Sequence, residues 1–396
     1  MNLIQKRSTV SAFNKYILGM LTVLAAGYGA YFLVSTFFTS PQNSINNHAR
    51  QTTELGISVS PPLINNGGGW WESNSLIYHG IPTRILFFLP PGNNLQPTAV
   101  NEAAWQEFER IGRIFNPFSP TSEIARLNAT PWPRHPPLRL IVSKDIYTVM
   151  IMSREIWNQS SGNFDPTLWP VKQLWQNAEK IQKVPPGQDI DTALRSMGFG
   201  KVRLIDDQRY TIEIEDHPVM FDFGGIVKGY AVDQVRKILL EKGVAAGLVQ
   251  LGGEVSPFGN NEGGNPWRIG VQHPKQMDKV WGVIEAQGSL RVSTSGNYRQ
   301  PIMIKGQSFY HIFSPKTGLP VSEKVLGVTT ACIGENTSNA RLDGVATAIT
   351  VMGPSAGLQL AEKLRIEALV LFETDDGTIG ELTTKGFGSH YKREDR

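Results

Sequence analysis

Two adjacent glycines near the middle of the chain stand where a phosphate group could be held. Gly224 and Gly225 interrupt an alternating apolar run, and apolar residues then recur at helical spacing up to a stop at Gly243. This pattern predicts a strand, a tight turn and a helix. Glycine lets the backbone approach a ligand closely, and a helix N-terminus offers unpaired N–H groups to an anion. An ordinary tight turn explains the same residues, and the spacing matches neither the dinucleotide fingerprint nor the P-loop.

A carboxylate and a hydroxyl towards the C-terminus have the spacing of a metal-binding pair. The segment from Ser338 to Met352 begins with capping residues and is followed by Gly353 and Pro354, which predicts a helix. Asp343 and Thr347 are four residues apart, so they project from one face of that helix. Hard oxygen ligands suit Mg²⁺, which completes its shell with waters and substrate phosphates. A solvated helix face or a local hydrogen bond is the alternative interpretation of this pair.

These residues belong to an ordered series of short motifs. The stretch Phe221–Asp233 resembles the glycine-lysine-glycine signature of the ApbE family, the flavin transferases that attach FMN to proteins. The resemblance covers residues 75 to 390 and implies a T-fold-like arrangement. Each motif is weak alone, whereas the ordered set is specific. The other matching segments are Ser122–Asn128, Gly162–Thr167, Leu251–Glu254, Ser293–Tyr298, His311–Pro320 and Asp343–Thr347.

The resemblance implies a reaction. FAD would be the donor, a Thr or Ser hydroxyl of a target protein would be the acceptor, and AMP would leave. This is phosphotransfer, in which Mg²⁺ neutralises phosphate charge while the protein positions the reacting groups. Two alternatives stay open: an FAD pyrophosphatase that releases FMN and AMP, and a non-catalytic flavin-binding or assembly protein. The expected partners are FAD and an acceptor protein, with a membrane redox subunit as the expected kind of acceptor.

The resemblance also implies roles for individual residues. Asp343 and Thr347 would bind the metal together with the backbone carbonyl of Val227. His311 would lie at the active site and accept the proton of the acceptor hydroxyl. The family usually has Asp where this chain has Ser314, and a serine there would weaken proton transfer. This departure is the reason for keeping a slower enzyme or a flavin-binding relative in view.

Ten further residues match motifs that surround FAD in the family. Small residues admit the ring system and the diphosphate, while hydroxyls and carboxylates can bond the ribityl and ribose groups. Several have a structural alternative, because Ser122 could begin a helix and Asp165 could be a turn residue before proline. Gly252 with Gly253 could make a hairpin turn, and Lys228 could form a salt bridge at a helix start instead of binding phosphate. The ten residues are Ser122, Glu123, Asp165, Thr167, Lys228, Gly252, Gly253, Thr294, Ser295 and Gly296.

The composition describes a folded protein and argues against nucleic acid as a partner. The chain has 396 residues, a formal net charge of +3 and no dense block of Lys and Arg. Such a chain lacks the electrostatic footprint of nucleic-acid binding. The single cysteine, Cys332, lies in an apolar run and has no partner for an intramolecular disulfide. We expect it to be an inert core thiol.

The N-terminal part predicts a membrane anchor. Residues 16–38 are apolar and uncharged, and basic residues concentrate before them in residues 1–15. This asymmetry places the N-terminus in the cytoplasm and the rest of the chain on the outer, periplasmic side of the cytoplasmic membrane. A cleaved signal peptide is the alternative. Residues 39–74 are expected to be a flexible linker, and residues 75–396 the flavin transferase domain. We expect Trp70 and Trp71 to pack onto that domain rather than touch lipid.

The domain itself is predicted to be α+β with a largely antiparallel sheet. Strand-like runs such as Ile85–Leu89 mix with helical runs such as Ala99–Ile114 and Ser143–Gln159, without strict βαβ repetition.

Overall fold

The computed structural model describes residues 60–78, 80–205, 208–296, 301–321 and 324–394. The expected cytoplasmic N-terminus and membrane anchor lie outside these ranges, as does most of the expected linker. Within them, no helix combines the length and the apolar character that crossing a membrane requires.

The folded domain begins before the predicted Ser75. β1 (Ile64–Gly67) and β2 (Trp70–Ile77) are antiparallel neighbours at one edge of the largest sheet. Trp70 is 6% exposed and packs against Phe88 and Trp267, so its expected packing onto the domain is confirmed. The prediction of a linker through residue 74 is therefore wrong from Ile64 onward. The glycine-rich composition that favours a linker belongs to the turn between these two strands.

One large antiparallel sheet organises the molecule. Its strands follow the order β1-β2-β3-β7-β8-β11-β14-β15-β16, and every neighbouring pair is antiparallel, which confirms the predicted fold class. The central strands are buried on both faces. Beyond β2, the strands are β3 (Ile81–Phe88), β7 (Ala246–Leu251), β8 (Glu254–Phe258), β11 (Leu290–Gly296), β14 (Val325–Ile333), β15 (Glu367–Glu373) and β16 (Ile379–Thr383).

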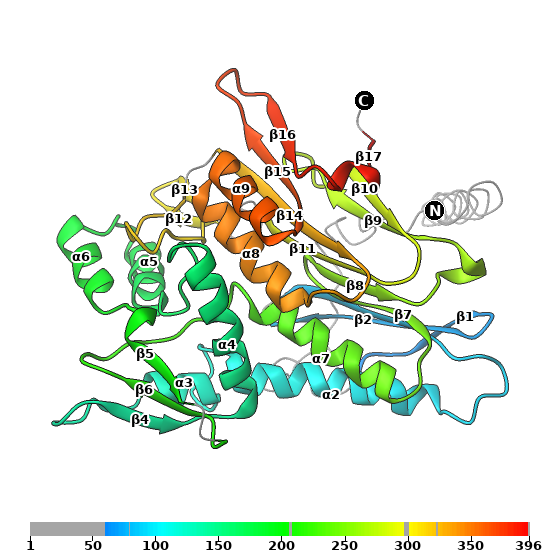
Figure 1. The fold of residues 1–396 in the computed structure, drawn as a ribbon, viewed down its shortest axis with the longest axis horizontal. Helices are drawn as coiled ribbons and strands as arrows, with labels where there is room; N and C mark the ends of the chain where they lie inside the picture. Colours follow the sequence, from blue (N-terminus) through cyan, green and yellow to red (C-terminus); the bar gives the residue numbers. More distant parts are fainter. Residues whose placement is uncertain (1–59, 79, 206–207, 297–300, 322–323, 395–396) are drawn as a thin grey trace, which may run out of the picture.

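A layer of helices covers one face of this sheet (Figure 1). The layer runs from α2 through α7 and α8 to α9, and the largest apolar core lies between these helices and the sheet. The functional motifs of α7 and α8 are thereby held side by side against the central strands. The helices of this layer are α2 (Pro97–Phe115), α7 (Val227–Glu241), α8 (Asn339–Met352) and α9 (Pro354–Leu364).

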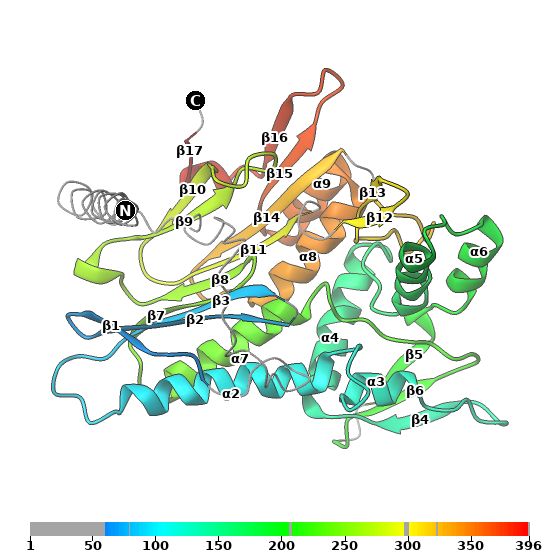
Figure 2. The same ribbon diagram turned by 180° about the vertical axis from the view of Figure 1, so that it is seen from behind.

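A smaller sheet covers the opposite face, seen from behind in Figure 2. Trp267 and Trp281 from this sheet join Leu86, Val292 and Leu369 of the large sheet in a second core. The large sheet is thus enclosed on both sides. The smaller sheet has the order β17-β10-β9, with β9 (Trp267–Gln272), β10 (Val280–Ala286) and β17 (Tyr391–Arg393).

The remaining elements gather at one end of the molecule (Figure 1). A small sheet β4-β6-β5 packs beneath α4, and a two-stranded sheet β12-β13 lies beside α5. The elements there are α3 (Glu123–Asn128), β4 (Leu138–Ile141), α4 (Lys144–Gln159), α5 (Trp169–Ile181), α6 (Gly187–Arg195), β5 (Val202–Ile205), β6 (Thr211–Ile214), β12 (Ile302–Ile304) and β13 (Gln307–Phe309). The described residues also contain three short 3₁₀ turns: Phe199–Lys201, Glu262–Gly264 and Phe387–Ser389.

Candidate active site

The glycine turn leads into α7, but no strand precedes it. Residues 221–223 are irregular, so the predicted strand there is wrong, although the turn and the helix are confirmed. The Asn128 side chain bonds both the N–H and the carbonyl of Phe221, and the Asp222 N–H donates to the Pro166 carbonyl, so this backbone is paired without a neighbouring strand. Asp222 in turn accepts the Gly224 N–H at 3.0 Å within the turn. The residue before α7, Ile226, supplies no side-chain cap. The helix start is therefore left to polar groups from elsewhere in the fold.

Gly225 is required by the close approach of α8. A Cβ built on Gly225 would meet both Cγ2 and Oγ1 of Thr347 at 3.0 Å. The Thr347 hydroxyl lies 3.2 Å from the Gly225 carbonyl oxygen and donates to it. The turn thus presents a carbonyl oxygen directly beside one of the two residues expected to bind metal.

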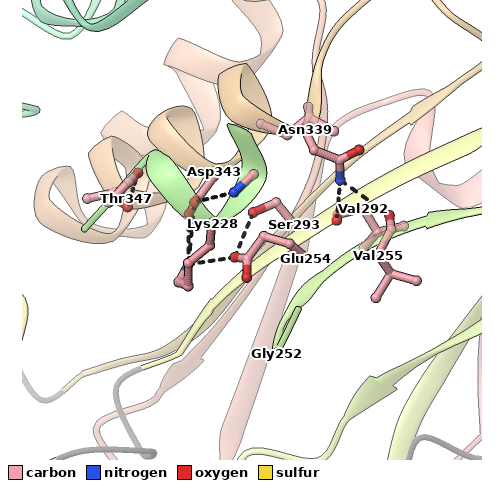
Figure 3. A network of polar contacts seen from close by, with 12 residues as sticks. Lys228, Gly252, Glu254, Val255, Val292, Ser293, Asn339, Asp343 and Thr347 are labelled. Carbon is pink, nitrogen blue, oxygen red and sulfur yellow. Dashed lines mark hydrogen bonds and ion pairs between the residues drawn. The ribbon is translucent and has the colours of Figure 1, made fainter. Parts of the chain in front are cut away.

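Helix α8 forms as the sequence predicts and is anchored at its start. Ser338 caps it by accepting the Arg341 N–H, and Asp233 of α7 accepts the N–H groups of Asn339 and Ala340 at 3.0 and 2.9 Å. The Asn339 side chain donates to backbone carbonyls of β8 and β11 (Figure 3). These bonds fix α8 against the sheet, so the positions of residues one and two turns later are fixed too.

Asp343 and Thr347 lie on one face of α8, as expected, and Asp343 is fully buried. The Asp343 carboxylate accepts the Gly229 N–H at 3.0 Å and contacts the Lys228 ammonium at 3.2 and 3.4 Å. Gly229 permits this, since a Cβ there would lie 2.3 Å from the Asn339 carbonyl oxygen. The start of α7 and the middle of α8 therefore form one polar unit.

Lys228 bridges two buried carboxylates (Figure 3). Its Nζ lies 2.8 Å from Glu254 Oε1, and Glu254 is fully buried at the start of β8. Burial alone would lower the pKa of Lys228, but the charges of Asp343 and Glu254 outweigh it and hold that pKa above its ordinary value. The salt-bridge interpretation of Lys228 is what the structure shows.

His311 lies in the loop after β13 with a buried, unbonded ring nitrogen. Its Nδ1 has no hydrogen-bond partner among the described residues. Burial, together with the positive charges of Lys172 and Lys228, lowers the pKa of His311 to about 4. The imidazole is therefore neutral at pH 7 and able to accept a proton.

Ser314 forms a turn in the same loop. Its carbonyl accepts the Gly318 N–H at 2.8 Å, and its hydroxyl lies 3.3 Å from the Lys316 N–H. The loop closes on α5, where Trp175 donates to the Gly318 carbonyl at 2.9 Å. These contacts give Ser314 an architectural role.

Four of the ten residues expected at the flavin maintain local structure. Ser122 caps α3 by accepting the Ala125 N–H, and Glu123 accepts the Ser143 N–H before α4. Asp165 accepts bonds from Trp157 and from both the backbone and the hydroxyl of Thr167. Burial raises the pKa of Asp165. The structural alternatives for Ser122 and Asp165 are thus realised.

Apart from Lys228, the other expected flavin residues lie at the ends of central strands of the large sheet, next to Glu254. Gly252 and Gly253 are the two-residue turn between β7 and β8, as the hairpin alternative predicts, with Gly252 at φ +64°. A Cβ on Gly253 would lie 2.5 Å from the Thr294 carbonyl oxygen. Thr294, Ser295 and Gly296 end β11 and are only partly buried, so this strand end is accessible from solvent.

No role was assigned from the sequence to three residues of the site, which are Glu254, Lys172 and Asp222. Glu254 is the last residue of the motif that begins at Leu251, and its acidic side chain inside an apolar strand was the available signal. Lys172 of α5 binds Asp222 at 2.8 Å and lies over the rings of Phe118 and Trp169. No local pattern joins Lys172 to Asp222, which are 50 positions apart.

The oxygen atoms at the junction of α7 and α8 fit Mg²⁺. They are a buried carboxylate, the Thr347 hydroxyl and the Gly225 carbonyl, and an ammonium group is already bound to the carboxylate. Positive charge is thus stable at this position. The described residues contain no cluster of three or more His, Cys, Asp or Glu side chains able to hold a metal. The Val227 carbonyl, at the first position of α7, stays a predicted ligand.

Cys332 is half-buried in β14, where burial raises the pKa of its thiol. A raised thiol pKa disfavours the reactive thiolate, in keeping with the expectation of an inert cysteine.

Comparison with known proteins places these motifs in a family. The model described as "ApbE family" matches residues 80–370. A curated FAD:protein FMN transferase from Haemophilus influenzae is 26% identical over 290 residues, covering 71% of this chain and 82% of that protein. Another from Vibrio cholerae serotype O1 is 29% identical over 238 residues, covering 60% and 69%.

Solved structures agree with the sequence comparison. The apo form of the Pseudomonas stutzeri flavinyl transferase ApbE is 26% identical with a TM-score of 0.69, covering 81% of this chain and 96% of that one. The ApbE protein of Thermotoga maritima is 27% identical with a TM-score of 0.70, covering 81% and 99%. Since the family model spans the glycine turn, α7, the buried carboxylates and α8, the chain belongs to the ApbE family.

Proposed function

We propose that the chain is an FAD:protein FMN transferase that moves FMN from FAD to a Thr or Ser hydroxyl of another protein, with Mg²⁺ at the junction of α7 and α8. Family membership and the activity named for its curated relatives support flavin transfer. The observation that carries the metal-dependent step is that Asp343 and Thr347 project from one face of α8, beside the Gly225 carbonyl of the turn that precedes α7.

The metal would be held by Asp343, Thr347 and a backbone carbonyl of the glycine turn, from Gly225 or Val227. Bound there, Mg²⁺ supplies neutralisation of the diphosphate charge that otherwise repels an attacking oxygen. Few protein ligands are available, which leaves coordination positions for phosphate oxygens and water. The uncapped start of α7 adds N–H groups that favour an anion at the same place.

The transfer balances without an external oxidant or reductant. The acceptor oxygen forms a bond to the phosphorus of the FMN half of FAD, and the bond from that phosphorus to the AMP oxygen breaks. The hydroxyl proton passes to His311. Its imidazole is neutral, and Nδ1 makes no competing hydrogen bond with the described residues. Lys172 and Lys228 supply positive charge around the anionic substrate.

Ser314 keeps two other functions open. Without a carboxylate in this loop, water could replace the acceptor hydroxyl, and the enzyme would be an FAD pyrophosphatase that releases FMN and AMP. As a serine, Ser314 supplies no carboxylate to a proton relay, and its hydroxyl lies 3.3 Å from the Lys316 N–H. A non-catalytic flavin-binding protein would release neither product.

Location is part of the proposal. We place residues 16–38 across the cytoplasmic membrane as a single anchor, residues 1–15 in the cytoplasm, and the ApbE domain on the outer side. The charge asymmetry around the apolar segment supports this orientation. A domain tethered there would meet membrane redox subunits as acceptors.

One experiment separates these functions. The purified full-length chain is incubated with FAD, Mg²⁺ and a Thr-containing acceptor peptide, and flavin-labelled peptide, free FMN and AMP are quantified. A transferase yields labelled peptide and AMP in equal amounts. Free FMN and AMP without labelled peptide would establish the pyrophosphatase instead, and unchanged FAD would establish a binding protein.

A further inference from the structure

We infer that Glu254 is a positioning residue that holds Lys228 when a divalent cation takes Asp343, so that the metal and the lysine can occupy the site together. The inference deepens the proposed function and rests on its metal site. It concerns how the Lys228 ammonium is shared between two buried carboxylates.

The geometry shows an uneven sharing. Lys228 Nζ is 2.8 Å from Glu254 Oε1, whereas its distances to the two Asp343 oxygens are 3.2 and 3.4 Å. Glu254 is therefore the nearer partner of Lys228, and the side chains of both carboxylates are buried. A metal at Asp343 would therefore displace the weaker of the two lysine contacts.

The charges show why a holding group is needed. One ammonium and two carboxylates leave a net charge of −1 at the site, and a divalent cation converts it to +1. Two cations sharing Asp343 alone would repel each other in a region of low dielectric constant. With Glu254 present, the ammonium keeps a full ion pair at 2.8 Å after Asp343 has turned to the metal.

The contacts around the site favour a shift of the Lys228 side chain away from Asp343 over movement of the whole helix. Asp343 keeps the Gly229 N–H at 3.0 Å, and Glu254 also receives the Ser293 hydroxyl at 3.4 Å. Both carboxylates are thus fixed by other donors. Of the three charged groups, Lys228 has the longest side chain and is the most exposed, at 30% of its side chain, so it is the one that can shift.

Mn²⁺ binding tests the inference without relying on activity. The full-length chain is titrated with Mn²⁺ as a paramagnetic stand-in for Mg²⁺, and the free ion is measured by electron paramagnetic resonance. Four chains form a double-mutant cycle: wild type, Glu254→Gln, Lys228→Met and the double variant. Glu373→Gln serves as the matched control, since Glu373 pairs with Lys275 in an exposed ion pair elsewhere.

We expect Glu254→Gln to lower the Mn²⁺ affinity, and we expect this loss to depend on the presence of Lys228. Groups that orient metal ligands typically contribute about 10–100-fold in metal affinity, so Glu254→Gln should weaken Mn²⁺ binding at least about tenfold when Lys228 is present. In the Lys228→Met background the same change should cost much less, because no ammonium is freed to compete for Asp343. Glu373→Gln should leave the affinity unchanged.

Two other results would overturn the inference. An equal loss of Mn²⁺ affinity in both backgrounds would show that Glu254 acts only through its negative charge. A larger loss in the Lys228→Met background would show that Glu254 coordinates the metal itself. Thermal unfolding of each variant, together with Glu254→Asp, controls for folding, and the Glu254→Asp variant should recover part of the affinity. If Mn²⁺ binding to wild type is absent or insensitive to Asp343→Asn, the proposed metal site fails and the inference fails with it.

Discussion

His311 is a neutral base surrounded by positive charge. Burial lowers the pKa of His311 to about 4, the charges of Lys172 and Lys228 act in the same direction, and Asp222 opposes them. An anionic diphosphate bound between these lysines would weaken their effect on the ring. The charge arrangement thus couples substrate binding to the basicity of the group that receives the proton.

The acid limb of the pH profile should follow this arrangement. His311 must be neutral to accept a proton, so kcat/KM should fall as the pH drops through about 4 and should be independent of this group near pH 7. Lys172→Met removes one neighbouring positive charge, which raises the pKa of His311 and moves the limb to higher pH. Identical limbs in Lys172→Met and wild type would show that the imidazole is not the titrating base, and Lys275→Met is the matched surface control.

The Thr347 hydroxyl should matter as an oxygen donor. Thr347→Val keeps the shape of the side chain but removes the oxygen that now contacts the Gly225 carbonyl. We expect the Mg²⁺ concentration for half-maximal turnover of FAD to rise by roughly 10–100-fold. Thr347→Ser retains the hydroxyl and should stay within a few-fold of wild type. Unaltered Mg²⁺ dependence in the valine variant would remove Thr347 from the ligand set.

Ser314 permits a gain-of-function test. If an Asp at this position aids proton transfer, Ser314→Asp should raise the rate of transfer to an acceptor hydroxyl with little change in FAD affinity. General acid–base assistance is worth roughly 10²–10⁴-fold, so even partial restoration is measurable. His311→Ala should lower the rate in both backgrounds. An unchanged rate in Ser314→Asp with full activity in His311→Ala would make the loop purely architectural.

At the scale of elements, the junction of α7 and α8 positions the chemistry. The two helices approach so closely that Gly229 has no room for a side chain, since a Cβ would lie 2.3 Å from the Asn339 carbonyl oxygen. Asp233 on the next turn of α7 accepts the first two N–H groups of α8. The pair of carboxylates and the lysine between them depend on this spacing.

Gly229→Ala should therefore separate the helices. Forcing a methyl group into this contact typically costs about 1–3 kcal/mol or more, because a backbone carbonyl rather than a flexible side chain must move. We expect a lower midpoint of thermal unfolding together with weaker metal dependence. Gly388→Ala is the matched control, because a Cβ at Gly388 meets nothing within 4 Å. Wild-type stability in Gly229→Ala would mean that the two helices are not tightly packed.

Residues close together in the sequence were sufficient to predict α8, whereas contacts between distant residues could not be predicted. The bounds of α8 follow from Ser338 as cap and from Gly353 and Pro354, all near in sequence, and the structure agrees. The role of Glu254 depends on Lys228, 26 positions away, and that of Asp222 depends on Lys172, 50 positions away. Such pairs exist only in the folded chain, where α5 meets the segment before α7 and α7 meets β8. For the same reason the strand expected before Gly224 is absent, because the backbone of Phe221 pairs with the side chain of Asn128, 93 positions away.

At the scale of the whole molecule, the large antiparallel sheet separates two apolar cores. The face that carries α7 and α8 also carries the site. Composition and periodicity were sufficient for the α+β class, while the order of the strands depends on pairings across the full chain. The early start of the domain at β1 has the same origin, because Ile64–Gly67 is a strand only through its pairing with β2.

Membrane topology is the prediction that belongs to the full chain. A reporter that functions only outside the cytoplasm, fused after Arg396, should be active, and the intact protein should sediment with membranes. Activity of a cytoplasmic reporter would reverse the orientation. A released mature chain beginning near residue 40 would support a cleaved signal peptide instead of an anchor.

The central claim is that flavin transfer depends on Mg²⁺ held at Asp343. Its most direct test compares wild type with Asp343→Asn in the formation of flavin-labelled acceptor peptide over a range of Mg²⁺ concentrations. Asn keeps the size of the side chain but removes the charge that pairs with Lys228 and would bind the metal. We predict labelled peptide and AMP in equal amounts for wild type, abolished by chelation, and a rate at least about 100-fold lower in the variant at ordinary Mg²⁺. Equal rates and equal Mg²⁺ dependence in the two proteins would contradict the account.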